Sequence, residues 1–113
     1  MTCLFCRIVQ GEIPATIVLD EPDVLAFRDI TPVAPSHVLV IPKAHLSGLG
    51  AATEEHAAVL GKVMLAATKV AALEGIAESG FRTVINHGPD ANQTVPHLHV
   101  HVIGKRVLKW PPG

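Results

Sequence analysis

The sequence lacks an excess of charge of either sign. Nine Lys and Arg residues stand against ten Asp and Glu residues, and charged residues make up only 17% of the chain. Nucleic acids and anionic membrane surfaces are bound mainly through a field of positive charge. Because the chain has no such field, we expect no nucleic acid and no membrane among its partners. A small molecule is the more natural ligand.

Long apolar runs are also missing. No N-terminal segment combines a charged start with the uninterrupted apolar stretch of a secretory signal, and no uninterrupted run approaches the length of a membrane span. We therefore expect a cytoplasmic protein. Internal repeats, low-complexity tracts and linkers are absent as well. A chain of 113 residues suits one domain, so residues 1–113 are expected to form a single domain.

Cysteine is scarce, with only Cys3 and Cys6, separated by two residues. In a reducing compartment this spacing suggests metal binding or redox chemistry before a structural disulfide. Hydrophobic residues, in contrast, make up 49% of the chain. In a short soluble chain, such a high apolar fraction favours burial of apolar surface against a second copy, and we expect a homo-oligomer.

The apolar pattern predicts two helices and five strands. A long helix should begin at Thr53, a good N-cap followed by two glutamates, and its apolar residues wrap more than half of its circumference. Such a helix is expected to bury one side in its own domain and another against a partner copy. The predicted helices cover residues 5–10 and 53–73, and the predicted strands cover residues 16–19, 24–28, 37–41, 81–85 and 95–103.

The last of these strands contains His97, His99 and His101 in alternation with aliphatic residues. In an extended strand a period of two sends alternate side chains to the same face. The three imidazoles would then share one face while the aliphatic residues enter the core. The spacing predicts a site on a rigid strand. A solvated strand face is the plain alternative, and a metal site is another, because imidazole is a common metal ligand.

The stretch from His97 to Val102 resembles the signature of the histidine triad (HIT) superfamily of nucleotide hydrolases and transferases. Other residues resemble the same family, and they are Phe27-Arg28-Asp29, Pro32, Pro35, His37, residues 39–43, His45 and Asn86. The ending Trp110-Pro111-Pro112-Gly113 is similar to that of the Hint branch. This resemblance implies hydrolysis of purine nucleoside 5′-phosphoramidates by a homodimer, with a purine nucleotide as the ligand.

The resemblance also implies the architecture. The expected fold is α+β, with an antiparallel sheet of about five strands, one long helix and one short N-terminal helix. Two copies are expected to join their sheets into one continuous sheet. The tail, residues 104–113, should be extended and lie at the dimer interface.

A neutral imidazole nitrogen can attack phosphorus and leave again without a metal. By the family's pattern, His99 attacks to give a nucleotidyl-histidine, while His101 and His37 contact the phosphoryl oxygens. A backbone carbonyl accepting from the other nitrogen of His99 would fix its tautomer. The implied catalytic residues are His99, His101, His37, Asn86 and Thr94.

The resemblance places Asp29 at the ribose hydroxyls and apolar residues around the base. Gln93 matches a position near the phosphate, although loop capping is an equally ordinary role for it. Taken singly, each apolar residue could be plain core. The implied nucleotide-binding residues are Leu4, Phe5, Ile8, Phe27, Asp29, Ile30, Asn86, Gln93, Thr94, His99 and His101.

A second constellation joins Cys3 and Cys6 to His45 and His97. Two thiolates and two imidazoles form a tetrahedral donor set that suits zinc and leaves no open position, so the metal would be structural. Some members of the Hint branch carry zinc at matching positions. The plain alternative is a pair of small buried thiols.

Several positions depart from the family's pattern. Asn92 stands where the Hint branch usually has glycine, and Asn is among the few residues that tolerate positive φ. Lys105 replaces a common second glycine, which leaves the path of the tail open. His56 and His87 match no catalytic position, and we expect both to be solvated.

Two other classes of function compete with the phosphoramidate hydrolase. One is a nucleotide-binding regulatory module with vestigial hydrolysis, which turnover at physiological substrate levels would distinguish. The other is a metal-dependent hydrolase that uses all three triad histidines as ligands, which would lose activity on chelation. The carboxylates that such metal sites usually add are missing nearby.

Overall fold

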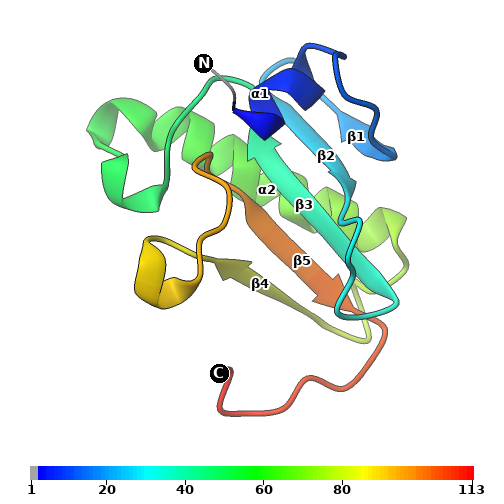
Figure 1. The fold of residues 1–113 in the computed structure, drawn as a ribbon. Coiled ribbons are helices and arrows are strands. Elements are labelled where there is room, and N and C mark those ends of the chain that lie inside the picture. The colour runs from blue at the N-terminus through cyan, green and yellow to red at the C-terminus, as the bar shows by residue number, and fades with distance from the viewer. Residues whose placement is uncertain (1–2) are drawn as a thin grey trace.

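The computed structural model describes residues 3–113 and contains one five-stranded antiparallel sheet in the order β1-β2-β3-β5-β4 (Figure 1). This confirms the predicted α+β fold. The elements are α1 (Leu4–Val9), β1 (Ile17–Asp20), β2 (Val24–Arg28), β3 (Ser36–Pro42), the 3₁₀ turns η1 (Leu49–Ala51) and η2 (Glu54–His56), α2 (Ala57–Leu73), β4 (Phe81–Ile85), the 3₁₀ turn η3 (Pro89–Ala91) and β5 (Val100–Gly104).

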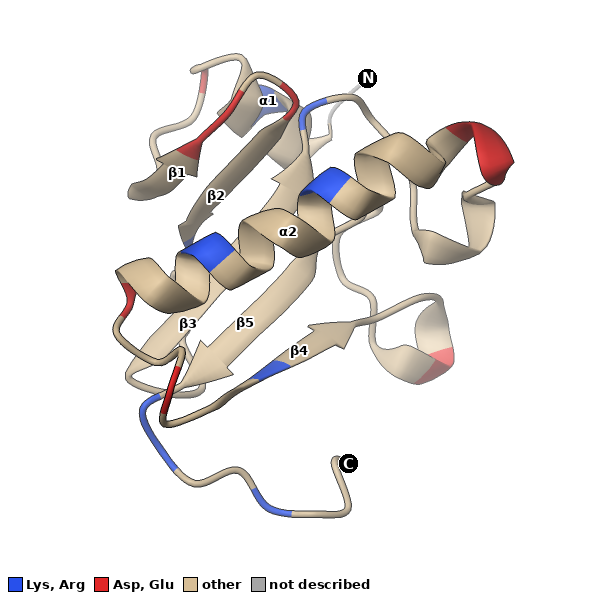
Figure 2. Ribbon diagram, turned by 180° about the vertical axis from the view of Figure 1, so that it is seen from behind, with Lys and Arg blue, Asp and Glu red and all other residues tan. Residues whose placement is uncertain are grey.

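Helix α2 covers one face of the sheet, as seen from behind in Figure 2. Its buried stripe follows the helical period and packs against alternate residues of β2, β3 and β5. This confirms that the predicted long helix buries one side in its own domain, although α2 begins at Ala57 and Thr53 instead caps the 3₁₀ turn η2. The members of this cluster are Val24, Ala26, Val38, Val40, Val63, Ala66, Ala67, Val70, Ala71, Ile76, Val100 and Val102.

The opposite face of the sheet packs against α1. The residues between those of the first cluster, such as Phe27 and Leu39, point to this side and meet Cys3 and Phe5. Cys3 is the N-cap of α1, and its Sγ accepts a hydrogen bond from the backbone N–H of Cys6 at 3.4 Å. A second small core therefore fixes the N-terminal helix over the centre of the sheet.

The helical run Glu54–Leu73 has 20 residues and contains an 18-residue window with a mean hydropathy of 1.4, enough in length and composition to cross a membrane. In the folded chain its buried stripe lies against the sheet. On its outer side, Lys62 pairs with Asp23 and Lys69 pairs with Glu21, each at 2.6 Å. We therefore interpret this run as the core helix of the domain.

The prediction of one strand over residues 95–103 was wrong at its beginning. Strand β5 starts only at Val100, so His97 and His99 precede it. Pro96 has no N–H for a ladder. The N–H of His97 donates back to the carbonyl of Val95, and the N–H of Leu98 donates to the carbonyl of Leu46, so both are lost to a strand ladder. The three histidines thus do not share one strand face.

Glu74, directly after α2, is a buried carboxylate that the sequence did not reveal. Both guanidinium Nη atoms of Arg28 donate to it at 2.7 Å, and the hydroxyl of Ser36 donates at 2.8 Å. The hydrogen bond from Arg28 is the main reason why the pKa of Glu74 lies below its ordinary value. The pair fastens the end of α2 to the sheet beside the loop that leads into β3.

Candidate functional site

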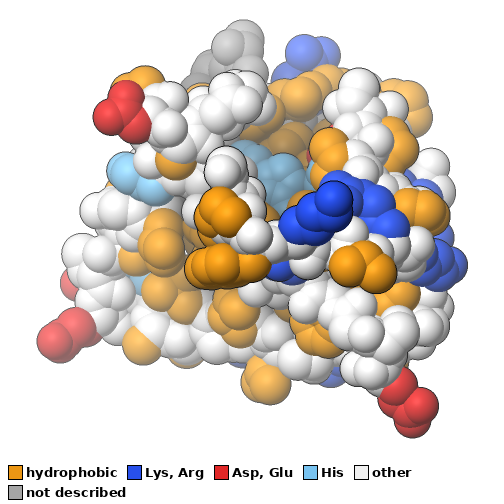
Figure 3. Space-filling model, turned by 90° about the horizontal axis from the view of Figure 1, so that it is seen from below, with side chains coloured by type: hydrophobic (Ala, Val, Ile, Leu, Met, Phe, Trp, Pro, Cys, Tyr) orange, Lys and Arg blue, Asp and Glu red, His pale blue; other side chains and the backbone are white. Residues whose placement is uncertain are grey.

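A pocket of about 330 Å³ opens on the α1 side of the sheet, and histidine side chains are visible in a hollow of the surface in Figure 3. The structure brings most of the predicted nucleotide-binding residues together in it. These are Leu4, Phe5, Ile8, Phe27, Asp29, Ile30, Thr94, His99 and His101. The lining also includes residues that the sequence analysis missed, namely Ile13, Pro14, Ala15, Arg28, Thr31, Leu39 and Val95.

The inner part of the pocket is aromatic and aliphatic. The ring of Phe5 meets that of Phe27 edge to face at 5.4 Å, and it meets that of His99 in the same way at 5.1 Å. Edge-to-face contacts hold rings in fixed orientations. Such a slot suits a flat, apolar group such as a nucleobase. The missed residues 13–15 follow α1 in a segment without regular structure, where no periodicity could have marked them.

His99 is buried, and its ring has one possible tautomer when neutral. Its Nδ1 lies 2.7 Å from the carbonyl oxygen of His97, which can only accept a hydrogen bond. Nδ1 therefore carries the proton, and Nε2 keeps its lone pair. The predicted carbonyl contact is confirmed, and it leaves an unprotonated nitrogen on a residue that lines the pocket.

A chain of hydrogen bonds orients the other two imidazoles. The N–H of Val33 donates to Nδ1 of His37 at 3.1 Å, so a neutral His37 carries its proton on Nε2. That nitrogen lies 2.8 Å from Nδ1 of His101 and 3.4 Å from Oδ2 of Asp29. When His37 donates to His101, a neutral His101 carries its own proton on Nε2. The pocket thus contains a donor nitrogen on His101 beside the lone pair of His99.

Both orienting imidazoles favour their neutral forms. Burial, followed by the charges of His99 and His37, lowers the pKa of His101 to about 4. Burial also lowers the pKa of His37, partly offset by the nearby carboxylate of Asp29. Because protonated imidazoles would repel one another here, the hydrogen-bond chain depends on near-neutral or alkaline conditions.

The lowered pKa values of His101 and His37 predict that the fold loses stability in mild acid. An unfolded histidine takes up a proton near pH 6.5, whereas folded His101 resists protonation until about pH 4. Between these values the unfolded chain binds more protons, so the free energy of unfolding decreases as pH falls. We expect a loss of about 1–3 kcal/mol from His101, with His37 adding to it.

Urea unfolding measured at intervals between pH 7 and pH 4.5 checks this expectation. His101→Asn removes one titrating group. Above pH 5, where few carboxylates titrate, the free energy of unfolding of this variant should therefore decrease less steeply as pH falls. Identical slopes for the variant and the wild type would contradict the assignment.

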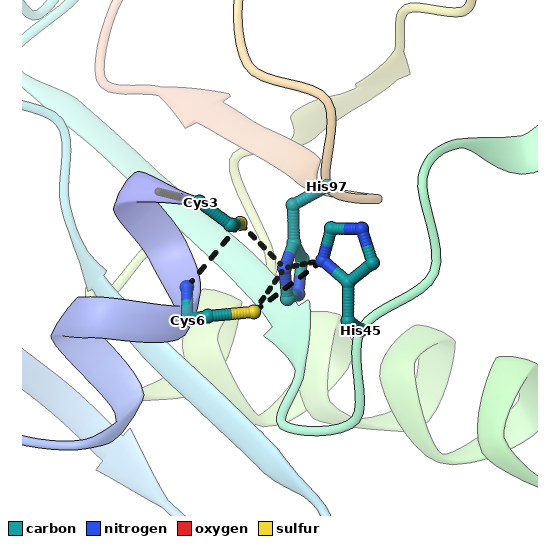
Figure 4. A group of neighbouring side chains, drawn as sticks. All are labelled: Cys3, Cys6, His45 and His97. Atoms are coloured by element: carbon teal, nitrogen blue, oxygen red, sulfur yellow. Dashed lines mark hydrogen bonds between the residues drawn. The ribbon is translucent and has the colours of Figure 1, made fainter. Parts of the chain in front are cut away.

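The second cluster joins Cys3 and Cys6 to His45 and His97, as Figure 4 shows. Nδ1 of His97 lies 3.4 Å from Sγ of Cys3, 3.6 Å from Sγ of Cys6 and 3.2 Å from Nδ1 of His45. Sγ of Cys6 lies 3.3 Å from Nδ1 of His45. Four donor atoms from α1 and two loops therefore face one another.

This donor set fits a tetrahedral zinc ion. With Zn–S bonds of about 2.3 Å and Zn–N bonds of about 2.0–2.1 Å, tetrahedral angles separate sulfur from nitrogen by about 3.6 Å and two nitrogens by about 3.3 Å. The observed separations are close to these values. Nε2 of His97 lies 2.8 Å from the carbonyl oxygen of Pro42, so Nε2 carries the proton and Nδ1 offers its lone pair to the cluster.

The three triad histidines do not converge on one metal ion. Both ring nitrogens of His97 are committed, one to the cysteine cluster and one to Pro42. Asp29, His37 and His101 also approach one another closely enough to hold an ion. However, Nδ1 of His37 accepts from Val33, so Nε2 must keep its proton and is a poor ligand. This donor chemistry argues against the metal-dependent alternative.

Two predicted ligand residues, Asn86 and Gln93, brace the loop over residues 86–94 instead of lining the pocket. Nδ2 of Asn86 donates to the carbonyl of Ala91 at 2.8 Å. Gln93 accepts from the N–H of Gly88 and donates to the carbonyls of Ser47 and Val95. Asn92 adopts φ 60°, in the left-handed region, as its tolerance of that region predicted.

A comparison with family models decides the relationship of the chain. The model of the HIT domain matches residues 10–108, which is most of the sequence. The chain belongs to the HIT family. The HIT match includes the three triad histidines, Asp29, His37 and His45, but it begins after Cys3 and Cys6.

Individual proteins are similar to the chain over nearly its whole length. An adenylylsulfatase HINT1 from Arabidopsis thaliana is 52% identical over 112 residues, covering 97% of this chain and 76% of that protein. A 14 kDa zinc-binding protein from Zea mays is 49% identical, covering 97% of this chain and 87% of that protein. A HIT family hydrolase from Legionella pneumophila Philadelphia 1 superimposes with a TM-score of 0.97 at 45% identity, over 99% of this chain and 100% of that one.

Proposed function

We propose that this HIT protein hydrolyses purine nucleoside 5′-phosphoramidates through a covalent nucleotidyl-histidine. HIT membership and the hydrolases among its relatives support a general nucleotide hydrolase. One observation carries the proposed mechanism. The hydrogen bond from Nδ1 of His99 to the carbonyl of His97 leaves Nε2 unprotonated on a residue of the pocket.

The pocket explains how a nucleotide would bind. The base enters the slot beside Phe5 and Phe27, and the ribose hydroxyls donate to Asp29, whose Oδ1 already accepts from Thr31. The α-phosphate then lies between His99, His101 and the hydroxyl of Thr94. Thr94 and His101 are uncharged hydrogen-bond donors, and they stabilise the negative charge on the phosphoryl oxygens.

The reaction has two balanced steps. Nε2 of His99 attacks the α-phosphorus in line, the bond between phosphorus and the amine nitrogen breaks, and the amine leaves with a proton taken from solvent. Water then attacks the same phosphorus, the bond to Nε2 breaks, and the nucleoside monophosphate departs with release of a proton. Through both steps His101 donates to a phosphoryl oxygen, and His37 maintains the tautomer of His101.

A sulfate leaving group is a second candidate. Figure 3 shows Lys and Arg side chains gathered beside the hollow that contains the histidines. Arg106 donates from Nε to the carbonyl of Val33 at 3.0 Å, and Val33 is the residue whose N–H donates to His37. Positive charge near this hollow favours an anionic leaving group. The relative named adenylylsulfatase is consistent with this choice.

The test is to follow AMP release from adenosine 5′-phosphoramidate and from adenosine 5′-phosphosulfate under identical conditions. The proposal expects turnover of the phosphoramidate with the higher kcat/KM. A higher value for the phosphosulfate would favour the second candidate. Binding of AMP without turnover of either compound would instead support the regulatory module.

We also propose that Cys3, Cys6, His45 and His97 hold one structural zinc ion. The observed donor separations and the fixed tautomer of His97 support this. When bound, the metal would supply a cross-link between α1 and the segment before β5. Burial raises the pKa of the Cys6 thiol, so a cation is needed to favour its thiolate.

Replacing Cys6 with Ala should abolish stoichiometric zinc and lower the thermal midpoint by several degrees, because one ligand and the cross-link are lost. Elemental analysis and calorimetry measure these effects. Cys6 and Cys3 lie outside the phosphate site, so a reduced kcat in the variant would show that the cross-link positions His99 through His97. Full zinc content in the variant would contradict the ligand assignment.

We further propose a homodimer with a continuous sheet. Among the described strands, β4 lies at an edge and has one side free for pairing. Phe81 on β4 is exposed, and α2 exposes Met64, Leu65 and Leu73, with 37–63% of each residue accessible. Phe81 thus adds apolar surface to the open strand, and the exposed residues of α2 are the side that the predicted long helix would bury elsewhere. Analytical ultracentrifugation should give the molar mass of two chains.

A further inference from the structure

His87, which the proposed mechanism does not use, lies across the backbone of a neighbouring loop. The N–H of Gly50 donates to its Nδ1 at 3.1 Å. A Cβ added at Gly50 would lie 2.5 Å from Nε2 of His87, and one at Gly48 would lie 2.5 Å from Nδ1. Such separations are too short for any side chain. The two glycines therefore provide the space in which this imidazole sits.

A second contact joins the same two loops. Nε2 of Gln93 donates to the carbonyl of Ser47 at 2.8 Å, next to Gly48. The loop over residues 86–94 is thus fastened to residues 47–50 near its beginning by His87 and near its end by Gln93. Although His87 is exposed, it is not simply solvated as the sequence predicted.

The fastened loop leads directly to the reaction site. Thr94 follows Gln93 and lines the pocket together with His99 and His101. Its hydroxyl can meet the phosphate only if the preceding loop is held in place. A ring that accepts a hydrogen bond from Gly50 supplies one of the two points of attachment.

We propose that His87 is a positioning residue that holds the loop over residues 86–94 against Gly48 and Gly50, and so places Thr94 at the substrate phosphate. This inference rests on the proposed hydrolytic function. It requires an acceptor at Nδ1 and a flat side chain above the glycines. It does not require His87 to touch the substrate.

Two substitutions separate the acceptor from the bulk of the side chain. In His87→Asn, Oδ1 can take the place of Nδ1 and accept from Gly50. His87→Leu keeps a side chain of similar size but has no acceptor. We expect kcat/KM for adenosine 5′-phosphoramidate to fall about tenfold in His87→Leu and to stay within about twofold of wild type in His87→Asn. Adenosine, which lacks a phosphate, should bind all three proteins equally.

Hydrogen exchange followed by mass spectrometry gives a readout that is independent of catalysis. Amides of residues 86–94 should exchange faster in His87→Leu than in wild type, and His87→Asn should restore protection. Gly50→Ala should reproduce the faster exchange, because its Cβ displaces the ring. His56→Leu is the matched control, since His56 also accepts a backbone N–H, from Thr53, but at the start of the long helix.

The outcomes are distinguishable. If the wild type fails to turn over any nucleotide, the proposed function is wrong. Hydrogen exchange then still tests whether His87 holds the loop over residues 86–94. Wild-type exchange and wild-type kinetics in His87→Leu would overturn the inference. Equal losses in His87→Leu and His87→Asn would also overturn it, because the hydrogen bond would then not be the cause.

Discussion

Replacing His99 with Asn should lower kcat/KM for a nucleoside phosphoramidate at least about a thousandfold. The Asn amide can still donate to the carbonyl of His97, as Nδ1 of His99 does at 2.7 Å. It has no counterpart of Nε2, so the proposed nucleophile is removed while the local hydrogen bond is kept. Steady-state release of AMP measures the loss. Rapid quenching and mass spectrometry should detect a nucleotidyl adduct on the wild type only.

The matched control is His56→Asn, which alters a histidine outside the pocket and should leave turnover unchanged. Zinc content and the unfolding midpoint of His99→Asn should stay near the wild-type values, which excludes general misfolding as the cause. Activity within tenfold of wild type would remove His99 from the role of nucleophile. His101 would then be the remaining candidate nucleophile in the pocket, and it would need His37 to accept the proton of its Nδ1, since its Nε2 carries a proton when His37 donates to it.

Arg28→Ala should reduce the free energy of unfolding by about 2–4 kcal/mol, one of the largest effects expected from a single residue outside the core. Its partner Glu74 is almost fully enclosed, and loss of Arg28 would leave that carboxylate with Ser36 alone. Arg28 itself is 45% exposed, so water would partly solvate the site and keep the loss below that of a fully buried pair. Chemical denaturation measures the effect.

A double replacement separates the cost of an unpaired charge from the net contribution of the pair. Arg28→Met combined with Glu74→Leu should be far less destabilising than Arg28→Ala, because no buried charge remains. The exposed pair of Lys62 and Asp23 is the matched control, and Lys62→Ala should leave the midpoint unchanged within error. Additive losses in the double variant would show that Arg28 and Glu74 do not act as a pair.

Local composition was sufficient to locate the regular elements. The strands over residues 24–28 and 81–85 have the predicted bounds, and the long helix ends at Leu73 as predicted, because apolar runs between turn signals mark such elements. The beginning of β5 was not predictable in this way. There the backbone is taken by contacts with Leu46 and Val95, and a strand pattern cannot report such partners.

The site shows the same division. Alternation identified His97, His99 and His101 as special, yet their separate surroundings depend on residues such as Cys6 and His37 that are distant in sequence. Only the family resemblance connected them before the structure. The Arg28–Glu74 pair had no sequence signal at all, since two opposite charges separated by 46 positions look like ordinary surface residues.

Helix α1 has two roles although it has only six residues. It supplies Cys6 to the donor cluster, with Cys3 at its cap, and it supplies Leu4 and Phe5 to the wall of the pocket. It also lies before the part of the chain that matches the HIT model. If this segment is exchanged, we expect the proposed zinc content and base preference to change together, while the sheet and His99 and His101 stay as they are. Under the proposed function, we therefore expect substrate choice to be separable from the chemistry at this short helix.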